Sequence, residues 1–149
     1  GELQAWIRDG ERLLVVYPRR EPNADNDTEA DRLNVAEGGE RWARMFPGLV
    51  GTLTALDSED VKRERLAAFS AGTVRILVCT TVVEMGINLP ELRRIVIVSP
   101  HLLGLMSLHQ LRGRVARRGG EGWCDLYAQE SLRPDQRKRL LQFARIGDG

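Results

Sequence analysis

The sequence is poor in cysteine, and it has no long apolar run. Cys79 and Cys124 are its only cysteines, and neither has a second cysteine at the short spacing that zinc sites use. We therefore expect two buried free thiols in a reducing compartment rather than a disulfide. No apolar run approaches the 18 or more residues of a membrane span, and no signal-peptide pattern is present. We expect a cytoplasmic protein without membrane contact.

Lysine is almost as scarce, and its scarcity excludes one way of holding a nucleotide. Of 22 basic residues only Lys62 and Lys138 are lysines, and neither follows a glycine. The phosphate-binding motif G-x-x-x-x-G-K-[ST] is therefore absent, so the chain cannot cradle nucleotide phosphates in that loop. The other basic residues are arginines, which we attribute to genomic base composition. Because the net charge is only +1, their clustering matters more than their number.

What the sequence does contain is a series of short apolar runs. With 149 residues, 42% of them hydrophobic, the chain can form one domain with a sizeable core. Runs without polar alternation predict strands buried on both faces, as in a parallel sheet covered by helices. The predicted strands are residues 13–17, 76–79, 95–98 and 123–127, with a weaker one at 49–53.

The segments between these runs predict helices. From residue 57 to 71, a cap at Asp57 or Ser58, an acidic first turn and Gly72 after the last turn predict one helix. Others are expected over 29–46, interrupted or weakened at Gly38-Gly39, and over 134–146, with a polar loop at 22–28. This alternation predicts an α/β fold with a doubly wound, mostly parallel sheet and helices on both faces.

The densest arginine cluster lies between His109 and Arg118. Read as a helix, at roughly 100° per residue, it places Gln110, Arg114 and Arg117 within a narrow arc. The opposite side is apolar and carries Leu108, Leu111 and Val115. A solvated arginine-rich helix would give the same pattern, but guanidinium groups also suit phosphate oxygens, because they present several N–H donors in one plane and keep their charge. Arg112 projects roughly 200° from Gln110, outside this arc.

A second stretch, residues 79–90, begins at the carboxyl end of a predicted strand. Open α/β sheets bind their ligands at that edge. Thr80 and Thr81 offer hydroxyl and backbone N–H groups to phosphate oxygens, Gly86 permits a tight backbone, and Asn88 could reach a sugar hydroxyl. A plain strand-to-helix connection would look the same. Together with the arginine helix, however, this stretch predicts two phosphate-seeking surfaces at one edge of the sheet.

These two stretches resemble motifs of superfamily 2 helicases. Residues 80–90 resemble motif V, and residues 110–117 resemble motif VI, of the form QxxGRxxR. The longer match, which includes Gly104-Leu105 and Leu108-His109-Gln110, is similar to the RecG family of branched-DNA helicases. Transcription-repair coupling factors are the next most similar family. They rank behind RecG because they usually carry tyrosine where this chain has His109. The resemblance covers residues 50–149 well and the first third loosely.

Three positions depart from the family pattern. Ala116 replaces a glycine of motif VI, and Asn88 stands where aspartate is common, which weakens or alters ribose recognition. Leu53-Thr54-Ala55 replaces a His-Gly pair, which puts one contact with the DNA backbone in doubt. The motif VI residues that match are Gln110, Arg114 and Arg117.

The resemblance implies that residues 1–149 form the second RecA-like lobe of an ATP-dependent DNA helicase, as a fragment of a larger multidomain protein. ATP and Mg²⁺ would be held mainly by the first lobe, with no metal ligand in this chain. The residues expected at ATP are Gly86, Asn88, Gln110, Arg114 and Arg117, of which the last three would act catalytically. Thr80 and Thr81 would hold a DNA strand by its phosphates. The implied partners are branched or forked DNA and the first lobe, and this lobe alone should not hydrolyse ATP.

Two other interpretations stay open at this point. A degenerate lobe could bind nucleic acid or protein without any hydrolysis. A stand-alone nucleotide-binding domain of flavodoxin-like design is disfavoured, because Tyr17-Pro18-Arg19-Arg20 stands where a glycine-rich loop would follow the first strand.

Overall fold

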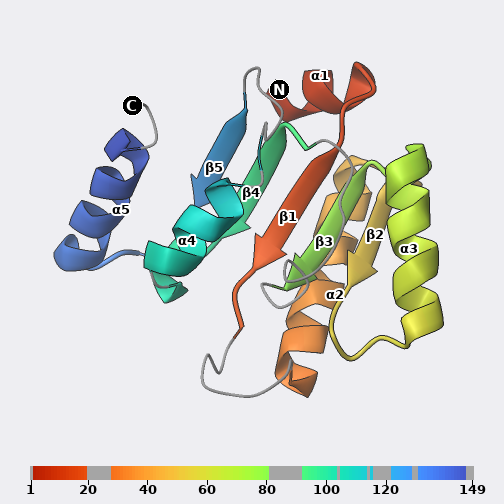
Figure 1. Ribbon diagram of the computed structural model, residues 1–149, viewed down its shortest axis with the longest axis horizontal. Helices are drawn as coiled ribbons and strands as arrows, with labels where there is room; N and C mark the ends of the chain where they lie inside the picture. Colours follow the sequence, from red (N-terminus) through yellow and green to blue (C-terminus); the bar gives the residue numbers. More distant parts are fainter. Residues whose placement is uncertain are drawn as a thin grey trace.

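Five parallel strands form one sheet, with helices against both faces (Figure 1). The computed structural model describes residues 2–19, 28–80, 92–103, 105–113, 115, 122–128 and 131–146. The elements in chain order are α1 (Glu2–Arg8), β1 (Leu13–Tyr17), α2 (Glu29–Met45), β2 (Val50–Leu53), α3 (Glu59–Ala71), β3 (Ile76–Thr80), β4 (Arg94–Val98), the 3₁₀ helix η2 (Pro100–Leu102), α4 (Leu105–Arg112), β5 (Trp123–Tyr127) and α5 (Pro134–Ile146). The predicted α/β class is confirmed. The loop predicted over 22–28 lies outside the described residues, apart from Thr28.

The sheet has the strand order β2-β3-β1-β4-β5, and its strands pair in parallel. All arrows in Figure 1 therefore point to the same edge. The central strand β1 pairs with β3 on one side and β4 on the other, and Tyr17 at its end lies in register with Thr80. The chain thus brings the ends of β1 and β3 together at the carboxyl edge, where parallel sheets bind ligands.

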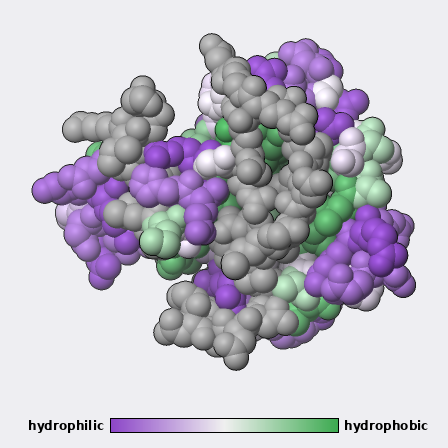
Figure 2. Space-filling view, viewed as in Figure 1, coloured by the Kyte–Doolittle hydropathy of each residue, from purple (hydrophilic) through white to green (hydrophobic). Residues whose placement is uncertain are grey.

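Alternate residues of each strand pack against different helices, because successive side chains point to opposite faces. On one face Leu14 and Val16 of β1 join a core with residues of α3, α4 and α5. On the other face Leu13, Val15 and Tyr17 join a core with residues of α1 and α2. Figure 2 shows that α3 and α5 present mostly hydrophilic side chains outward. No helix of the described chain is long and apolar enough to cross a membrane.

Helix α2 runs without interruption through Gly38 and Gly39, so of the two effects predicted for this pair, an interruption or a weakening, the interruption does not occur. Both glycines are buried. A Cβ on Gly38 would lie 2.5 Å from Cζ of Tyr17, and a Cβ on Gly39 would lie 2.5 Å from Cγ2 of Thr52. The pair therefore allows α2 to approach the strands closely. Packing against the sheet holds the helix together where its own propensity is low.

The helix predicted over 57–71 is confirmed, together with its caps. Ser58 Oγ accepts a hydrogen bond from the Val61 N–H at 3.2 Å, and Gly72 ends the helix with φ of 85°. A left-handed residue costs glycine little, because it has no Cβ. Helix α2 begins with a capping box, in which Thr28 and Asp31 each accept a hydrogen bond from the other's backbone N–H.

Helix α1, which the sequence did not predict, is fixed by a cluster of charged and aromatic residues. The buried Arg94 donates to Asp125 Oδ2 at 2.7 Å and to Glu2 Oε1 at 3.2 Å. Its guanidinium carbon lies 5.3 Å from the ring centre of Trp6 and 5.9 Å from that of Trp123. Burial lowers the pKa of Arg94, because it disfavours the charged form. The hydrogen bonds and charges of Asp125 and Glu2 raise the pKa by more, so the net shift is upward. This cluster ties α1 to the beginnings of β4 and β5.

Candidate nucleotide and DNA interface

The first predicted contact with DNA, Thr80, ends β3 at the carboxyl edge of the sheet. Its side chain is only 1% exposed. A direct contact between its hydroxyl and DNA would therefore need a rearrangement of this edge, and its role in DNA binding stays a prediction. The other residues predicted in this stretch, Thr81, Gly86 and Asn88, lie outside the described residues.

The segment that replaces the family's His-Gly pair is packed inward. Leu53 and Thr54 are buried. The Thr54 N–H donates to Oδ2 of Asp57 at 2.8 Å, and the Asp57 N–H donates to the Thr54 carbonyl at 3.2 Å. These bonds close a turn before α3. The Thr54 hydroxyl lies inside this turn and accepts from the Leu56 N–H at 3.3 Å, so it is not presented to a ligand.

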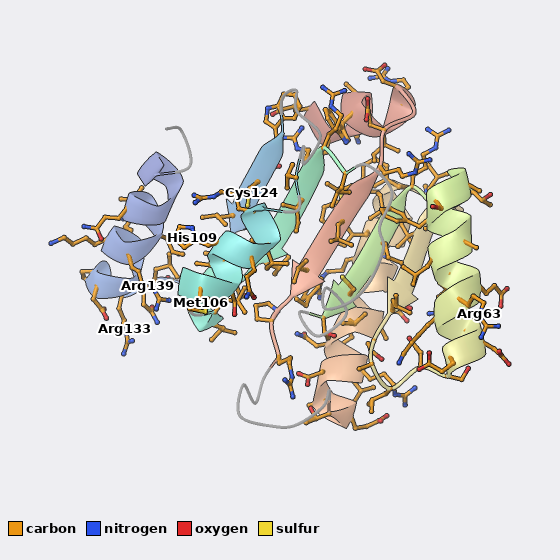
Figure 3. All side chains as sticks on the ribbon, in the orientation of Figure 1. Arg63, Met106, His109, Cys124, Arg133 and Arg139 are labelled. Atoms are coloured by element: carbon orange, nitrogen blue, oxygen red, sulfur yellow. The ribbon has the colours of Figure 1, made fainter. Side chains whose placement is uncertain are left out.

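Helix α4 carries the predicted catalytic residue that the structure describes, Gln110. Leu108 and Leu111 are fully buried in the core, while Gln110 is exposed. The predicted division between an apolar and a polar side is therefore confirmed for this part of the helix. The exposed Met106 stands one turn before Gln110 and is labelled in Figure 3 on the outer side of α4. The Gln110 side chain is thus exposed to solvent, on a helix whose opposite side is buried in the core.

Beyond Arg112 the structure departs from the sequence prediction, because α4 ends there. Gly113 lies in a turn, and its N–H makes a helical bond to the His109 carbonyl at 2.9 Å. Val115 then forms a parallel bridge with Leu92. Glycine is a poor helix former and the β-branched Val115 suits an extended backbone, which explains the early end.

Among the described residues the helix predicted over 109–118 extends only to Arg112, and the arc predicted for Gln110, Arg114 and Arg117 stays a prediction. Arg114 and Arg117 follow the helix end, and both lie outside the described residues.

The bridge between Leu92 and Val115 brings the two motif-bearing segments together. Leu92 follows the motif V stretch, and Val115 stands between the two arginines of motif VI. Leu92 is buried, and Val115 packs against the same core. Because Leu92 precedes β4, the two segments meet near the amino end of that strand, away from Thr80. The predicted position of two phosphate-seeking surfaces at one sheet edge stays a prediction, because most of their residues lie outside the described chain.

Arg112 is less isolated than the sequence suggested. It is half-buried, and its Nη2 lies 2.6 Å from Nδ1 of His109. Arginine can only donate, so Nδ1 accepts and the other ring nitrogen carries the proton. Burial raises the pKa of the nearby Cys124 thiol to about 11, an effect that Arg112 partly offsets. A change at Arg112 would disturb its neighbours, so it is a poor control for the other arginines.

No group of three or more histidine, cysteine or acidic residues in the described part of the chain could hold a metal ion. The residues that sequence reasoning missed here are Leu92, which has no motif of its own, and the exposed Met106 beside Gln110. Helical spacing from Gln110 could have found Met106. Only the fold shows the pairing of Leu92.

A model of the helicase conserved C-terminal domain matches residues 3–119. The chain belongs to this family. The ATP-dependent DNA helicase RecG of Helicobacter pylori strain J99 is 34% identical over 143 residues, which cover 96% of this chain and 21% of that protein. RecG of Aquifex aeolicus is 35% identical over 156 residues, covering 99% of this chain and 19% of that protein. The chain thus spans about a fifth of the length of these relatives.

Solved structures of helicases share its architecture. RecG bound to a three-way DNA junction matches 95% of this chain and 18% of that chain, with a TM-score of 0.71 and 30% identity. The yeast DEAD-box splicing factor Prp28 matches 99% of this chain and 30% of that chain, with a TM-score of 0.74. At 15% identity, this second likeness shows the fold alone. The resemblance to the second lobe of RecG helicases and the RecA-like fold are both confirmed.

Proposed function

We propose that this helicase C-terminal domain is the second motor lobe of an ATP-dependent, RecG-like DNA helicase that remodels branched DNA in recombination and repair. The observation that carries the proposal is the bridge between Leu92, two residues after the motif V segment, and Val115 in the middle of motif VI. The exposed amide of Gln110 lies on the helix that leads into this bridge. Residues suited to phosphate thus come from two segments that meet in the fold.

Gln110, Arg114 and Arg117 supply the catalytic groups of this lobe. The buried Leu108 and Leu111 fix the helix beneath Gln110, so its amide can position a nucleotide or water without reordering. Arg114 and Arg117 supply guanidinium groups as arginine fingers, which stabilise charge on the γ-phosphate. Hydrolysis of MgATP would supply the free energy for DNA remodelling, and the first lobe of the same protein would hold most of the nucleotide. Gly86 and Asn88 complete the nucleotide contacts on this side.

Thr80 and Thr81 place the DNA contact at the carboxyl edge of the sheet. Because the Thr80 side chain is buried, we assign the contact mainly to Thr81 and to backbone N–H groups that follow β3. Contacts of this kind position a strand by its phosphates without reading its sequence. Branched DNA is the favoured substrate, because a RecG relative with a solved structure is bound to a three-way DNA junction.

The test uses a protein that contains both lobes. Arg117→Ala should lower DNA-stimulated ATP turnover by about 10³-fold or more, mainly in kcat, because the lost cation acts on charge that develops in the transition state. Arg63→Ala on α3 is the matched control, since the Arg63 side chain is 76% exposed and its ion pair, at 3.4 Å, is with the exposed Asp60 of the same helix. It should leave turnover and Tm unchanged.

Two results would contradict the proposal. A two-lobed protein with an intact phosphate loop in its first lobe and no ATP turnover would favour the non-catalytic binding module instead. Equal losses of kcat in Arg117→Ala and Arg63→Ala would contradict the assignment of the arginine fingers.

A further inference from the structure

A cavity of about 370 Å³ opens on α5, apart from the residues assigned to ATP and DNA. It is lined by Leu132, Pro134, Arg137, Lys138, Leu141 and Gln142. Arg137, Lys138, Leu141 and Gln142 are exposed, whereas Leu140 on the opposite side of the helix is buried. The cavity therefore faces solvent, on the side of α5 opposite Leu140.

Helix α5, which forms one side of the cavity, is fixed to the rest of the domain by packing and hydrogen bonds. Leu140 packs into the core beside α4. Arg139 donates to the carbonyls of His101 and Leu103, at 2.9 and 3.2 Å, and so ties α5 to η2. Figure 3 shows Arg139 on the side of α5 that faces α4.

The lining combines an apolar floor with unopposed positive charge. Leu132, Pro134 and Leu141 supply the apolar side chains of the lining, and Leu141 is 54% exposed. Within the described part of the chain, neither Arg137 nor Lys138 pairs with a carboxylate. The neighbouring Arg133 does, since it lies 3.6 Å from Asp135.

We propose that this pocket binds an acidic peptide segment of a partner protein, which inserts an aliphatic or aromatic side chain between its carboxylates. Arg137 and Lys138 attract carboxylates. A side chain that enters the pocket would cover the exposed apolar surface of Leu141 and release water from it. A phosphate backbone would use the charges but would gain nothing from the apolar floor. None of the six lining residues named above is aromatic, so they offer no ring on which a base could stack. The chemistry therefore favours a peptide over a nucleic acid.

The site is independent of the proposed motor function. None of its lining residues belongs to the motif V or motif VI segments. Its variants should therefore leave ATP turnover of a two-lobed protein unchanged, which separates a failure of this proposal from a failure of the motor assignment.

The test measures binding of a fluorescein-labelled decapeptide to the 149-residue chain by fluorescence anisotropy at low salt. The peptide has a central Leu-Leu pair flanked on each side by four acidic residues. Leu141→Ser should weaken binding about 5- to 10-fold, from the apolar area lost. Arg137→Gln combined with Lys138→Gln should weaken it about 5-fold or more, and this loss should shrink as salt is added. Arg63→Gln, which removes an equally exposed charge from α3, should have no effect.

Three outcomes would overturn the proposal. The first is no binding at millimolar peptide. The second is equal binding of a peptide whose leucines are replaced by serine, together with no effect of Leu141→Ser. The third is a single-stranded oligonucleotide that displaces the peptide and loses affinity in the same double variant, which would make α5 a nucleic-acid surface instead.

Discussion

Replacing Gly38 by alanine sets two opposing effects against each other. Alanine in a helix interior is worth about 1 kcal/mol over glycine. In this fold, however, the new Cβ would lie 2.5 Å from Cζ and 2.6 Å from Oη of Tyr17. Carbon atoms need about 3.5 Å, so helix and ring must separate by about 1 Å. Tyr17 is 3% exposed, so its ring is packed on all sides and any movement must displace neighbours.

Overpacking of this kind costs about 1–3 kcal/mol, and a rigid buried ring favours the upper end. After the gain in helix propensity we expect Gly38→Ala to lower the free energy of unfolding by about 2 kcal/mol. For a chain of this length that corresponds to a fall in Tm of roughly 4–8 °C. Far-UV circular dichroism during thermal and urea denaturation measures both quantities.

Two further variants separate packing from helix propensity. Glu40→Ala, at an exposed position of the same helix, should change stability by no more than about 0.5 kcal/mol. In a Tyr17→Ala background the clash is absent, so Gly38→Ala should stabilise by up to about 1 kcal/mol, and the two changes should be strongly non-additive. A rise in Tm for Gly38→Ala in the unaltered chain would refute this reasoning, because it would mean that the glycine only weakens the helix.

Three other predictions concern activity, binding and pH. The 149-residue chain should fold but show no ATPase activity after controls for contaminants, because it lacks a phosphate loop. It should bind labelled single-stranded and forked DNA weakly and without sequence preference, and the affinity measured in a salt titration should fall as salt rises. Because burial raises the pKa of Cys124 from 9.0 to about 11, its neutral thiol stabilises the fold fully below pH 9, and this contribution is lost between pH 9 and about 11. The difference in unfolding free energy between the unaltered chain and Cys124→Ala should therefore shrink across that range.

The strands could be predicted from the sequence because β1 and β3 are nearly unbroken apolar runs and the other three are mostly apolar. The five residues of β5 and the thirteen of α5 match the predicted bounds. Both faces of this sheet are covered, so its strands contain little polar alternation, and the pattern is unambiguous. Local signals were also sufficient for α3, where Ser58 and Gly72 act as caps in the way their chemistry suggests.

Where the prediction failed, the deciding interaction was distant in sequence. Gly38 and Gly39 suggest a weak helix until the close approach of Tyr17 and Thr52 is known. Val115 has the spacing of an apolar helical position, but Leu92 offers its backbone as a partner, and the helix ends before it. The missed helix α1 likewise depends on Arg94, which is far from it in the chain.

The candidate site could be predicted in its residue types but not in its arrangement. The exposure of Gln110 follows from the positions of Leu108 and Leu111 on α4. The burial of Thr80 depends on the layers that cover the sheet edge, which no local pattern specifies. A motif identifies which chemistry is available, whereas the fold decides which of its groups reach solvent.

The arginines show the same principle, because their surroundings rather than their number determine what they do. Arg12 donates to the carbonyls of Phe69 and Ser70, at 2.7 and 2.6 Å, and so satisfies the end of α3. Arg75 donates to the Ile7 carbonyl at the end of α1, at 2.9 Å. Helix ends leave such carbonyls without partners, and a guanidinium can satisfy two of them while its charge favours the negative end of the helix dipole. These arginines therefore stabilise the fold. Arg137 and Lys138 on α5 differ from them, because neither pairs with a carboxylate in the described part of the chain, and this is why we expect their pocket to bind a ligand.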